Sequence, residues 1–499
     1  MAIMLFLLSL PLLMILISFI HKYYKKNARK IPPGPPGLPF IGNLLQINAS
    51  KTHESLSELS KIYGPELMSL KFGSVSVVII SSARMAREAL TTHDMVFSGR
   101  PASAGRRKLS YNRKDIAFSP YSDYWREMRK ICVLKLFSQK RVQSFLPVRV
   151  DEVSSMMMKI STLSSSSQLV NLRTLIMSFT SNVICRVAFG KRYEEEGHLK
   201  RRFDQLLQES QAMIGGFFVS DYIPCLSWMD RVSGMVGRLE KNFNELDLFF
   251  RELIDEHLSP NRPDSMKDDL LDLLIQLKHE ESSSLCLTWE HIKAILMDIF
   301  VAGTDTAAAS ILWAMTILMK NPETLKKVQA ELRDLVGNKR VVDEDDLGEL
   351  PYLKAVIKET LRLYPPAPIL GPRETTQSCT IDGYDIENKS LVLVNAWAIG
   401  RDPTYWKNPD DFIPERFINS KVDVKGHDFG LIPFGAGRRG CPGISLGMAT
   451  VELALANLLC CFDWELPNGI TCKDIDMDVM PGLTMYPKSD LSLLAKIYA

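Results

Sequence analysis

Hydrophobic positions divide the chain into segments with three different patterns. Residues 1–20 form a continuous apolar run without a charged side chain, and a helix of that length spans the roughly 30 Å hydrocarbon core of a bilayer. Residues 67–80 alternate as in a short β-hairpin, whereas 323–337, 352–364 and 443–461 repeat at helical spacing. The pattern predicts a mainly α-helical body with a minor β-sheet, preceded by a membrane-spanning segment.

The longest predicted helix starts at Trp289 and ends near Lys320. Thr288 is a favourable N-cap residue directly before it, and Pro322 prevents its continuation. At about 1.5 Å per residue this helix is roughly 48 Å long. We therefore expect it to cross the whole domain.

The N-terminal apolar run has the features of a retained membrane anchor. No basic residue precedes it, and a basic stretch follows it, namely Lys22, Lys25, Lys26, Arg29 and Lys30. A cleaved signal peptide would instead begin with basic residues and end at a small-residue cleavage site. By the positive-inside rule the rest of the chain lies on the cytosolic side, an orientation that a glycan on Asn48 or Asn388 would contradict.

The Pro-Pro-Gly-Pro-Pro-Gly sequence at 32–37 cannot continue a helix and predicts a stiff, extended spacer. Beyond this spacer no long linker, internal repeat or block of like charges divides the chain. We therefore expect an anchor at 1–21, a basic and Pro-rich linker at 22–39, and one large domain at 40–499.

Composition and charge narrow the classes of function. Apolar residues make up 46% of the 499 residues and charged residues 24%, which is typical of a globular protein with a large core and excludes a disordered or collagen-like chain. Sixty basic and 58 acidic side chains leave a net charge of +2, which argues against nucleic acid as a partner. Nine cysteines without a C-x-x-C pair argue against a disulfide framework or a zinc cluster.

A glycine-rich segment from Phe434 to Gly443 precedes an apolar helix and allows two interpretations. Its residues 435–440 match G-x-G-x-x-G, the dinucleotide-binding pattern, but that site needs a βαβ unit and only 58 residues follow Cys441. The stronger interpretation makes Cys441 a metal-ligating thiolate, because helix N-terminal amides favour an anionic sulfur. A haem iron with an axial thiolate meets these demands, with Arg439 pairing a cofactor carboxylate and Phe434 shielding the sulfur.

The complete pattern F-x-x-G-x-R-x-C-x-G at residues 434–443 resembles the cysteine loop of the cytochrome P-450 family. The resemblance extends over essentially the whole chain and is greatest to the A-type group of plant microsomal members. It implies the cytochrome P-450 fold, mainly α with a minor β-sheet, in a single large haem domain. It also implies that heme b is bound, with its iron held by the Cys441 thiolate.

The sequence Ala302-Gly303-Thr304-Asp305-Thr306 lies in the middle of the long apolar helix. On the simpler account the threonine hydroxyls bond to preceding carbonyls and the glycine relieves crowding. On the functional account a locally opened helix places oxygen and water beside the iron. The segment resembles the oxygen-activating stretch of the family, in which Thr306 would guide protons and Asp305 would supply them. Ala307 departs from the Ser or Thr of many members.

The resemblance also assigns residues to the substrate site. The side chains implied to face substrate are apolar: Phe118, Val301, Ala302, Ile369, Leu370 and Leu483. Asp298, one helical turn before Ala302, either contacts a polar group of the substrate or is a buried acid with its own hydrogen bonds.

Glu359 and Arg362 are three residues apart and share a helix face. Taken alone, such a pair is most often solvated and contributes little. Together with Arg416, some 50 residues later, it resembles the Glu-Arg-Arg network of the family, which implies a structural lock beneath the cysteine loop. Trp125 and Arg129, spaced as W-x-x-x-R, and Arg373 resemble the residues that contact the haem propionates.

Six basic residues against one acid lie between Arg126 and Arg141, and this face could steer an acidic electron donor. The resemblance implies that the donor is a separate membrane-bound NADPH-cytochrome P-450 reductase in the endoplasmic reticulum. We expect a single-pass membrane protein with a cytosolic catalytic domain.

The function expected from these features is that of a monooxygenase. It would use O2 and electrons from NADPH to oxidise a small hydrophobic plant metabolite: a terpenoid, a phenolic, an alkaloid precursor or, slightly favoured by the resemblance, an aldoxime. Two alternatives stay open. An oxygen-independent isomerase or dehydratase on the same fold would lack the acid-threonine pair, and a non-catalytic haem-binding protein would need no proton relay.

Overall fold

The computed structural model describes residues 30–193, 197–280, 285–339 and 341–498. The predicted anchor at 1–21 and the linker up to residue 29 lie outside the described residues. The Pro-rich residues 32–37 form no helix and contact the domain. The amide and hydroxyl groups of Ser69 donate to the carbonyls of Pro33 and Pro32 over 2.8 and 2.6 Å. This segment therefore lies against strand β1 (Leu67–Phe72).

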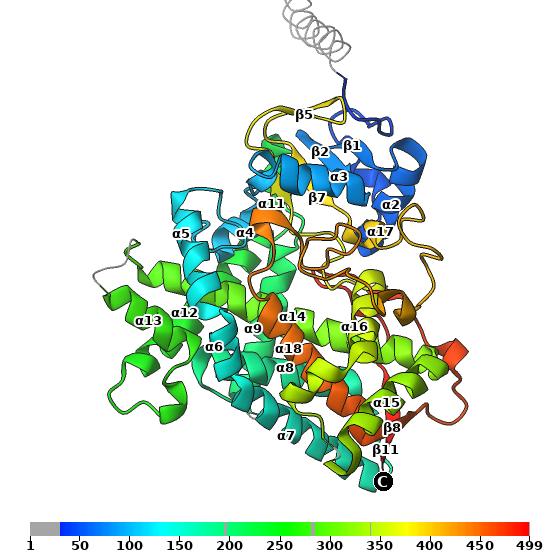
Figure 1. Cartoon of the computed structure of the whole chain (residues 1–499). Helices are drawn as coiled ribbons and strands as arrows, with labels where there is room; N and C mark the ends of the chain where they lie inside the picture. Colours follow the sequence, from blue (N-terminus) through cyan, green and yellow to red (C-terminus); the bar gives the residue numbers. More distant parts are fainter. Residues whose placement is uncertain (1–29, 194–196, 281–284, 340, 499) are drawn as a thin grey trace, which may run out of the picture.

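The body is mainly helical, as the hydrophobic spacing predicts (Figure 1). The described helices are α2 (Thr52–Tyr63), α3 (Ala83–Arg87), α4 (Ala104–Leu109), α5 (Asp123–Ile131), α6 (Gln139–Ser144), α7 (Leu146–Ser165), α8 (Leu172–Phe189), α9 (His198–Ile214), α10 (Val219–Tyr222), α11 (Trp228–Val232), α12 (Met235–Leu258), α13 (Leu270–His279), α14 (Trp289–Lys320), α15 (Pro322–Val336), α16 (Pro351–Leu363), α17 (Ala396–Ile399) and α18 (Ile444–Cys461). The predicted segments 323–337, 352–364 and 443–461 correspond to α15, α16 and α18 within one or two residues.

The described strands form four small sheets. Their bounds are β1 (Leu67–Phe72), β2 (Val75–Ile80), β3 (Leu169–Asn171), β4 (Arg373–Glu374), β5 (Cys379–Ile381), β6 (Tyr384–Ile386), β7 (Leu391–Val394), β8 (Phe462–Glu465), β9 (Val479–Met480), β10 (Tyr486–Pro487) and β11 (Ser492–Ile497). The predicted hairpin is the β1–β2 pair. The largest sheet has the order β1-β2-β7-β4, in which β7 joins β2 in parallel.

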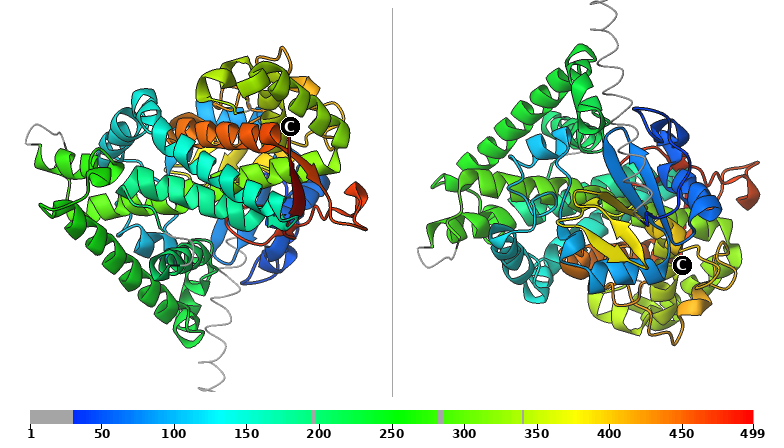
Figure 2. Two further views of the ribbon diagram at one scale, coloured as in Figure 1. Left: turned by 90° about the horizontal axis from the view of Figure 1, so that it is seen from below. Right: turned by 90° about the horizontal axis from the view of Figure 1, so that it is seen from above.

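Helix α14 is the central element of the helical part, and its bounds are those expected from the sequence. The Thr288 hydroxyl accepts from the amide of His291, whose side chain accepts from the Thr288 amide, so a complete capping box starts the helix. Helices α8 and α18 pack against α14, as the view from below shows (Figure 2). Among the described helices, α14 and α18 are apolar and long enough to cross a membrane, but most of each is buried in the protein, as in core helices.

Candidate functional site

The segment before α18 is a tight loop that brings Phe434 back to Cys441. The Cys441 amide donates to the Phe434 carbonyl over 2.9 Å, and the Gly440 amide donates to the Gly437 carbonyl over 3.1 Å. Gly437 has φ +68°, and a Cβ there would lie 2.3 Å from the carbonyl oxygen of Leu90. Only glycine meets both conditions, so this residue fixes the path of the loop.

The Cys441 side chain is exposed at the start of α18. Surrounding protein atoms raise the pKa of its thiol, while the Gly443 amide and the Arg129 guanidinium oppose that rise. Within the part of the chain that the structure describes, no three His, Cys, Asp or Glu side chains gather as metal ligands. A metal at Cys441 would therefore take most of its ligands from a cofactor, as iron does in a porphyrin.

Arg439 and Trp125 lie together beside this loop. The Arg439 guanidinium is 4.1 Å from the centre of a Trp125 ring and donates to the carbonyls of Ser98 and Ser119 over 2.9 and 2.7 Å. The Trp125 indole N–H donates to the Ile116 carbonyl over 2.9 Å. The single N–H donor of the Trp125 indole is thus already used within the protein, and the buried indole ring packs against the Arg439 guanidinium.

Two further predicted arginines contact the cysteine loop. Arg129 donates to the Gly440 carbonyl over 2.7 Å, and Arg373 donates to the Ala436 carbonyl over 2.8 Å. Arg373 also lies 3.3 Å from the carboxylate of Asp94. The loop that carries Cys441 is therefore held by both side chains.

Arg100 belongs to the same cluster, although no motif in the sequence pointed to it. Its guanidinium donates to the Pro372 carbonyl over 2.6 Å, and its Nε is buried without a hydrogen-bond partner among the described residues. Burial and the charges of Arg439 and Arg373 hold the pKa of Arg100 well below its usual value. The sequence signal that could have identified Arg100 is an arginine that has no acidic residue next to it and precedes a proline.

The arginine cluster carries more positive charge than its surroundings neutralise. Burial lowers the pKa of Arg439 to about 9 and that of Arg373 to about 10, and repulsion between the guanidinium groups adds to both shifts. Asp94 is the acid in contact with Arg373, and it is shared with Arg438. Buried like charges are costly unless an anion joins them. This site fits a cofactor that bears carboxylates and presents a metal to Cys441.

The middle of α14 combines an accessible face with a buried acid. Ala302 is exposed although most of the helix around it is buried, so open space must lie beside it. The hydroxyls of Thr306 and Thr304 donate to the carbonyls four residues earlier, over 2.7 and 3.1 Å. The helix is continuous there and shows no local opening. These contacts agree with the simpler account, in which the threonine hydroxyls bond to preceding carbonyls. The functional account, in which oxygen and water lie beside this helix, depends on the exposed face at Ala302.

Asp305 is buried and points away from open solvent, toward Gln211 and Tyr486. The Tyr486 hydroxyl also donates to the Asp305 carbonyl over 2.8 Å. Burial raises the pKa of the Asp305 carboxyl to about 6, and the nearby polar side chains of Gln211 and Tyr486 oppose that rise. A carboxyl with a pKa near neutrality can both hold and release a proton.

Asp298 makes hydrogen bonds of its own. Its carboxylate accepts the amide protons of Ile116 and Ala117 over 2.9 and 3.3 Å and lies against Asp115. Burial raises the pKa of Asp298 to about 6 and that of Asp115 well above its usual value. The geometry favours a carboxyl pair that holds a loop over a direct contact between Asp298 and substrate.

The apolar residues predicted to face substrate differ in exposure and location. Phe118 and Ile369 are half-buried, Val301 and Leu370 are buried, and Leu483 is 41% exposed. A Cβ added at Gly435 of the cysteine loop would lie 3.8 Å from Leu370, and one added at Gly215, after α9, would lie 3.8 Å from Leu483. The structure thus places Leu370 next to the Cys441 loop and Leu483 beside the end of α9.

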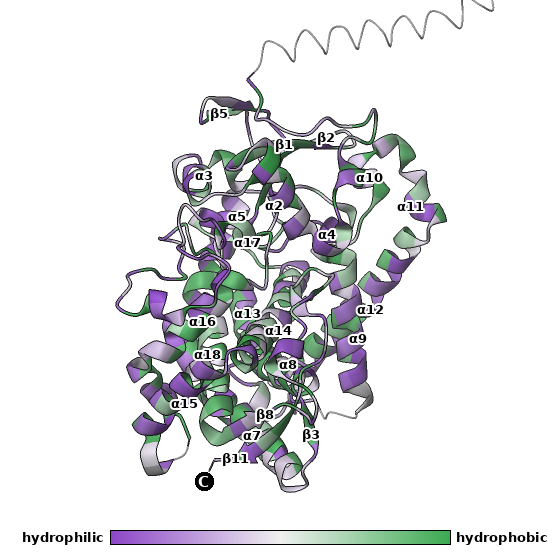
Figure 3. Ribbon diagram, turned by 90° about the vertical axis from the view of Figure 1, so that its right-hand side faces the viewer, coloured by the Kyte–Doolittle hydropathy of each residue, from purple (hydrophilic) through white to green (hydrophobic). Residues whose placement is uncertain are grey.

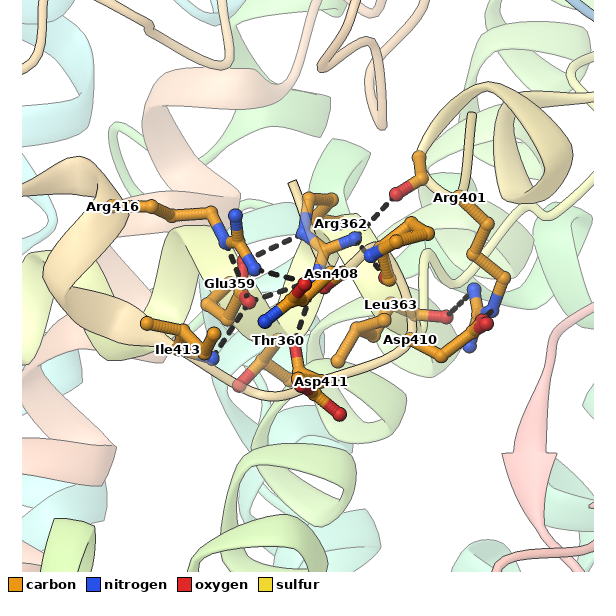
Figure 4. A network of polar contacts seen from close by, with 12 residues as sticks. Glu359, Thr360, Arg362, Leu363, Arg401, Asn408, Asp410, Asp411, Ile413 and Arg416 are labelled. Carbon is orange, nitrogen blue, oxygen red and sulfur yellow. Dashed lines mark hydrogen bonds and ion pairs between the residues drawn. The ribbon is translucent and has the colours of Figure 1, made fainter. Parts of the chain in front are cut away.

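Glu359, Arg362 and Arg416 form one buried network (Figure 4). Arg362 grips Glu359 with two hydrogen bonds of 2.6 and 2.8 Å, and Arg416 adds one of 3.0 Å. The Arg362 and Glu359 side chains are 0% exposed, which excludes the interpretation as a solvated pair. Arg362 also donates to the carbonyl of Asp411 over 3.0 Å, so the network ties α16 to the irregular segment that follows α17.

Comparisons with known proteins agree with this geometry. The sequence model of one family, described as Cytochrome P450, matches residues 32–493. The chain is 50% identical to 6,7,8-trihydroxycoumarin synthase of Pastinaca sativa over 98% of each chain, and 44% identical to strychnine-11-hydroxylase of Strychnos nux-vomica over 98% and 97%. A zebra fish cytochrome P450 structure with progesterone superimposes with a TM-score of 0.75 at 27% identity, over 89% of this chain and 99% of that one. The expected fold, mainly α with a minor sheet in one domain, is confirmed.

Proposed function

The chain belongs to the cytochrome P450 family and is a monooxygenase, and on this premise we propose that Cys441 supplies the thiolate that holds its haem iron. The observation that carries the proposal is the exposed Cys441 at the start of α18, beside four arginines with too few counter-charges. The propionates of heme b would supply the missing negative charge. Arg100, Arg129, Arg373 and Arg439 would hold them, and Trp125 would support Arg439 from behind.

When bound, haem supplies the activation of dioxygen and the oxidation of substrate. One oxygen atom enters a C–H bond of the substrate as a hydroxyl group, and the other leaves as water. The balance requires two electrons, which NADPH supplies, and two protons. The residues of this chain position the haem and the substrate, exclude water from the site and supply the protons.

The roles of the distal residues follow from their places on α14. The small side chain of Ala302 leaves room beside the helix, and Thr306 lies one turn further along the same side. Asp305, with its pKa raised to about 6 by burial, would provide protons that Thr306 passes on. This acid-threonine pair supports a monooxygenase over an isomerase or dehydratase on the same fold.

For the substrate we propose a small hydrophobic plant metabolite. Relatives of this chain are named 6,7,8-trihydroxycoumarin synthase, xanthotoxol synthase and strychnine-11-hydroxylase. These names support an oxygenated aromatic compound of the coumarin type as the first choice, in place of an aldoxime. Terpenoids and alkaloid precursors follow. Phe118, Val301, Ile369, Leu370 and Leu483 would line its site.

The proposed electron donor is a separate NADPH-cytochrome P-450 reductase in the endoplasmic reticulum membrane. The exposed basic residues Arg126 and Lys130 lie on α5, the helix that also carries Arg129 of the arginine cluster. An acidic partner docked on α5 would thus stand close to the haem. The N-terminal residues 1–21 would anchor the chain by a single span, with its domain on the cytosolic side.

A reduced carbon monoxide difference spectrum tests the proposal directly. Holoprotein with a thiolate ligand gives a Soret band shifted far to the red, and the Cys441→Ser variant should lose that band. A folded, haem-loaded wild type without the band would overturn the proposal. Incubation with reductase, NADPH and a panel of coumarins, read by mass, should then give products heavier by one oxygen atom.

A further inference from the structure

Arg106 lies on the inner side of helix α4, between the loop that carries Phe118 and helix α10. Its guanidinium carbon is 5.8 Å from the centre of the Phe118 ring. The neighbouring α10 contributes Asp221 and Tyr222, which lie close enough to act electrostatically on the Arg106 guanidinium. Figure 3 shows α4 beside α10, with α11 and α12 further out. Arg106 is therefore next to a residue proposed to face substrate.

The Arg106 guanidinium has no partner of its own. Across residues 30–193, 197–280, 285–339 and 341–498, no carbonyl, carboxylate or hydroxyl group accepts a hydrogen bond from it, and its Nε is buried and unsatisfied. The other basic residues of α4 are different. Lys108 pairs with Glu240 over 2.6 Å, and the exposed Arg107 lines a separate cavity of about 760 Å³ that opens toward α11 and α12.

The charged groups around Arg106 do not replace such a partner. The carboxylate of Asp221 accepts the Ala104 amide over 2.9 Å, and burial raises its pKa to about 6. Burial also raises the pKa of Tyr222, so that its hydroxyl stays neutral. Arg100, on the other side, adds positive charge. A partly buried guanidinium without a hydrogen-bond acceptor costs stability that a bound anion would recover.

We propose that Arg106 determines substrate specificity by binding a phenolate or carboxylate oxygen of a flat aromatic substrate whose ring lies against Phe118. The inference rests on the proposed function, which places Phe118 in the substrate site. A guanidinium is planar and offers several N–H donors in a fixed fork, which suits an oxygen anion in the plane of an aromatic ring. A neutral hydrocarbon substrate would leave the cation unpaired, so the site discriminates against it.

The test compares matched acids and esters on the haem-loaded, full-length protein. Calorimetric titration with cinnamate and methyl cinnamate, and with 2-naphthoate and its methyl ester, measures the preference for the anion. In Arg106→Gln the Kd of each acid should rise at least about tenfold, because charge-assisted hydrogen bonds are lost, while the Kd of each ester changes less than about twofold. Arg106→Lys should retain part of the preference, and Arg107→Gln should leave all four affinities unchanged.

Each contrary result has a definite meaning. Equal weakening of acids and esters in Arg106→Gln would show a packing role and overturn the inference. So would the failure of wild-type holoprotein to bind either acid. The reduced carbon monoxide spectrum, recorded on the same preparations, keeps the two hypotheses apart. If the red-shifted band is present but the protein shows no preference for the acids, only the Arg106 inference is wrong. If the band is absent, the proposed function is wrong.

Discussion

The carboxyl groups of Asp115 and Asp298 join the loop that carries Phe118 to the central helix α14. Asp298 accepts from the amides of Ile116 and Ala117, and Asp115 accepts from the amide of Phe118 over 2.9 Å. Asp115 is buried and Asp298 is half-buried beside it, and two neighbouring acids favour the state in which a proton remains between them. The proton therefore helps to hold Phe118 in place, and its loss should loosen the loop.

This pair gives the protein a stability that depends on pH. Burial raises the folded-state pKa of Asp298 from 3.8 to about 6, so its contribution is fully present below pH 3.8 and is lost as the pH rises through 6. Replacing Asp298 by Asn mimics the protonated acid and removes that loss. Between about pH 4 and pH 7 the thermal unfolding midpoint of wild type should fall more than that of Asp298→Asn, by an amount equivalent to roughly 1–3 kcal/mol.

Circular dichroism melts at closely spaced pH values provide the measurement. Asp305, whose pKa is also raised to about 6 by burial, contributes to the same window in both proteins and cancels in the comparison. Parallel curves for wild type and Asp298→Asn would show that this carboxyl does not hold the proton.

We predict that replacing Thr306 changes the coupling of NADPH oxidation to product formation and does not change folding. Its hydroxyl bonds to the Ala302 carbonyl beside the exposed face of α14. In Thr306→Ala the haem content should be unchanged, but the fraction of NADPH oxidation that yields product should fall severalfold, with the electrons appearing as hydrogen peroxide. The matched control is Thr304→Ala, because Thr304 makes the same bond to Phe300 from a fully buried position. Equal coupling in both variants would contradict a proton relay through Thr306.

At the scale of secondary-structure elements, sequence reasoning succeeded where the determinants are local. Helix α14 begins and ends where the Thr288 cap and Pro322 require, and the β1–β2 hairpin follows from alternation over a short turn. Strand β7, only four residues long, was missed because it pairs with β2 across more than 300 residues. The contact of the Pro-rich segment with Ser69 was not predicted, because it depends on the position of β1.

The network around Glu359 connects two elements and should be essential to both. Arg362→Ala leaves the fully buried Glu359 carboxylate with one arginine instead of two, beside the Ile413 amide, a loss of about 3–5 kcal/mol for a broken buried pair. The segment that leads to the cysteine loop would lose its tie to α16. We therefore expect Arg362→Ala to be expressed mostly without haem, as read by the Soret absorbance per milligram of protein. Lys354→Ala, on the same helix but at a residue that donates to the Gly348 carbonyl over 3.4 Å and takes no part in the Glu359 network, should retain haem. Equal haem loss in both variants would contradict the assignment.

At the scale of the whole molecule, the site is assembled from parts that no local pattern connects. The motif around Cys441 identified the loop and Arg439, whereas Arg373 and Trp125 became credible only through family resemblance. Arg100 and Arg106 were not predicted because what marks them is a buried Nε without a hydrogen-bond partner among the described residues, which is visible only when the surrounding residues are placed. The sequence therefore predicted the fold well, whereas the electrostatics of the arginine cluster became visible only in the structure.

The basic face of α5 extends the site to the surface and makes a final prediction about electron transfer. Arg126 and Lys130 are 56% and 64% exposed, and their acidic neighbours Asp123 and Glu127 form pairs that solvent weakens. If this face receives an acidic reductase, replacing Lys130 by Glu turns attraction into repulsion at the docking surface.

Stopped-flow reduction of the haem by NADPH and reductase should therefore be several-fold slower in Lys130→Glu than in wild type at low salt. Raising the ionic strength should bring the two rates together, because screening shortens the range of the interaction to about 8–10 Å. Lys496→Glu makes the same change of charge at an exposed position on β11, far along the chain from α5, and should be reduced at the wild-type rate. A rate for Lys130→Glu that matches this control at every salt concentration would place the docking surface elsewhere, because a charge reversal at a true contact cannot be silent at low ionic strength.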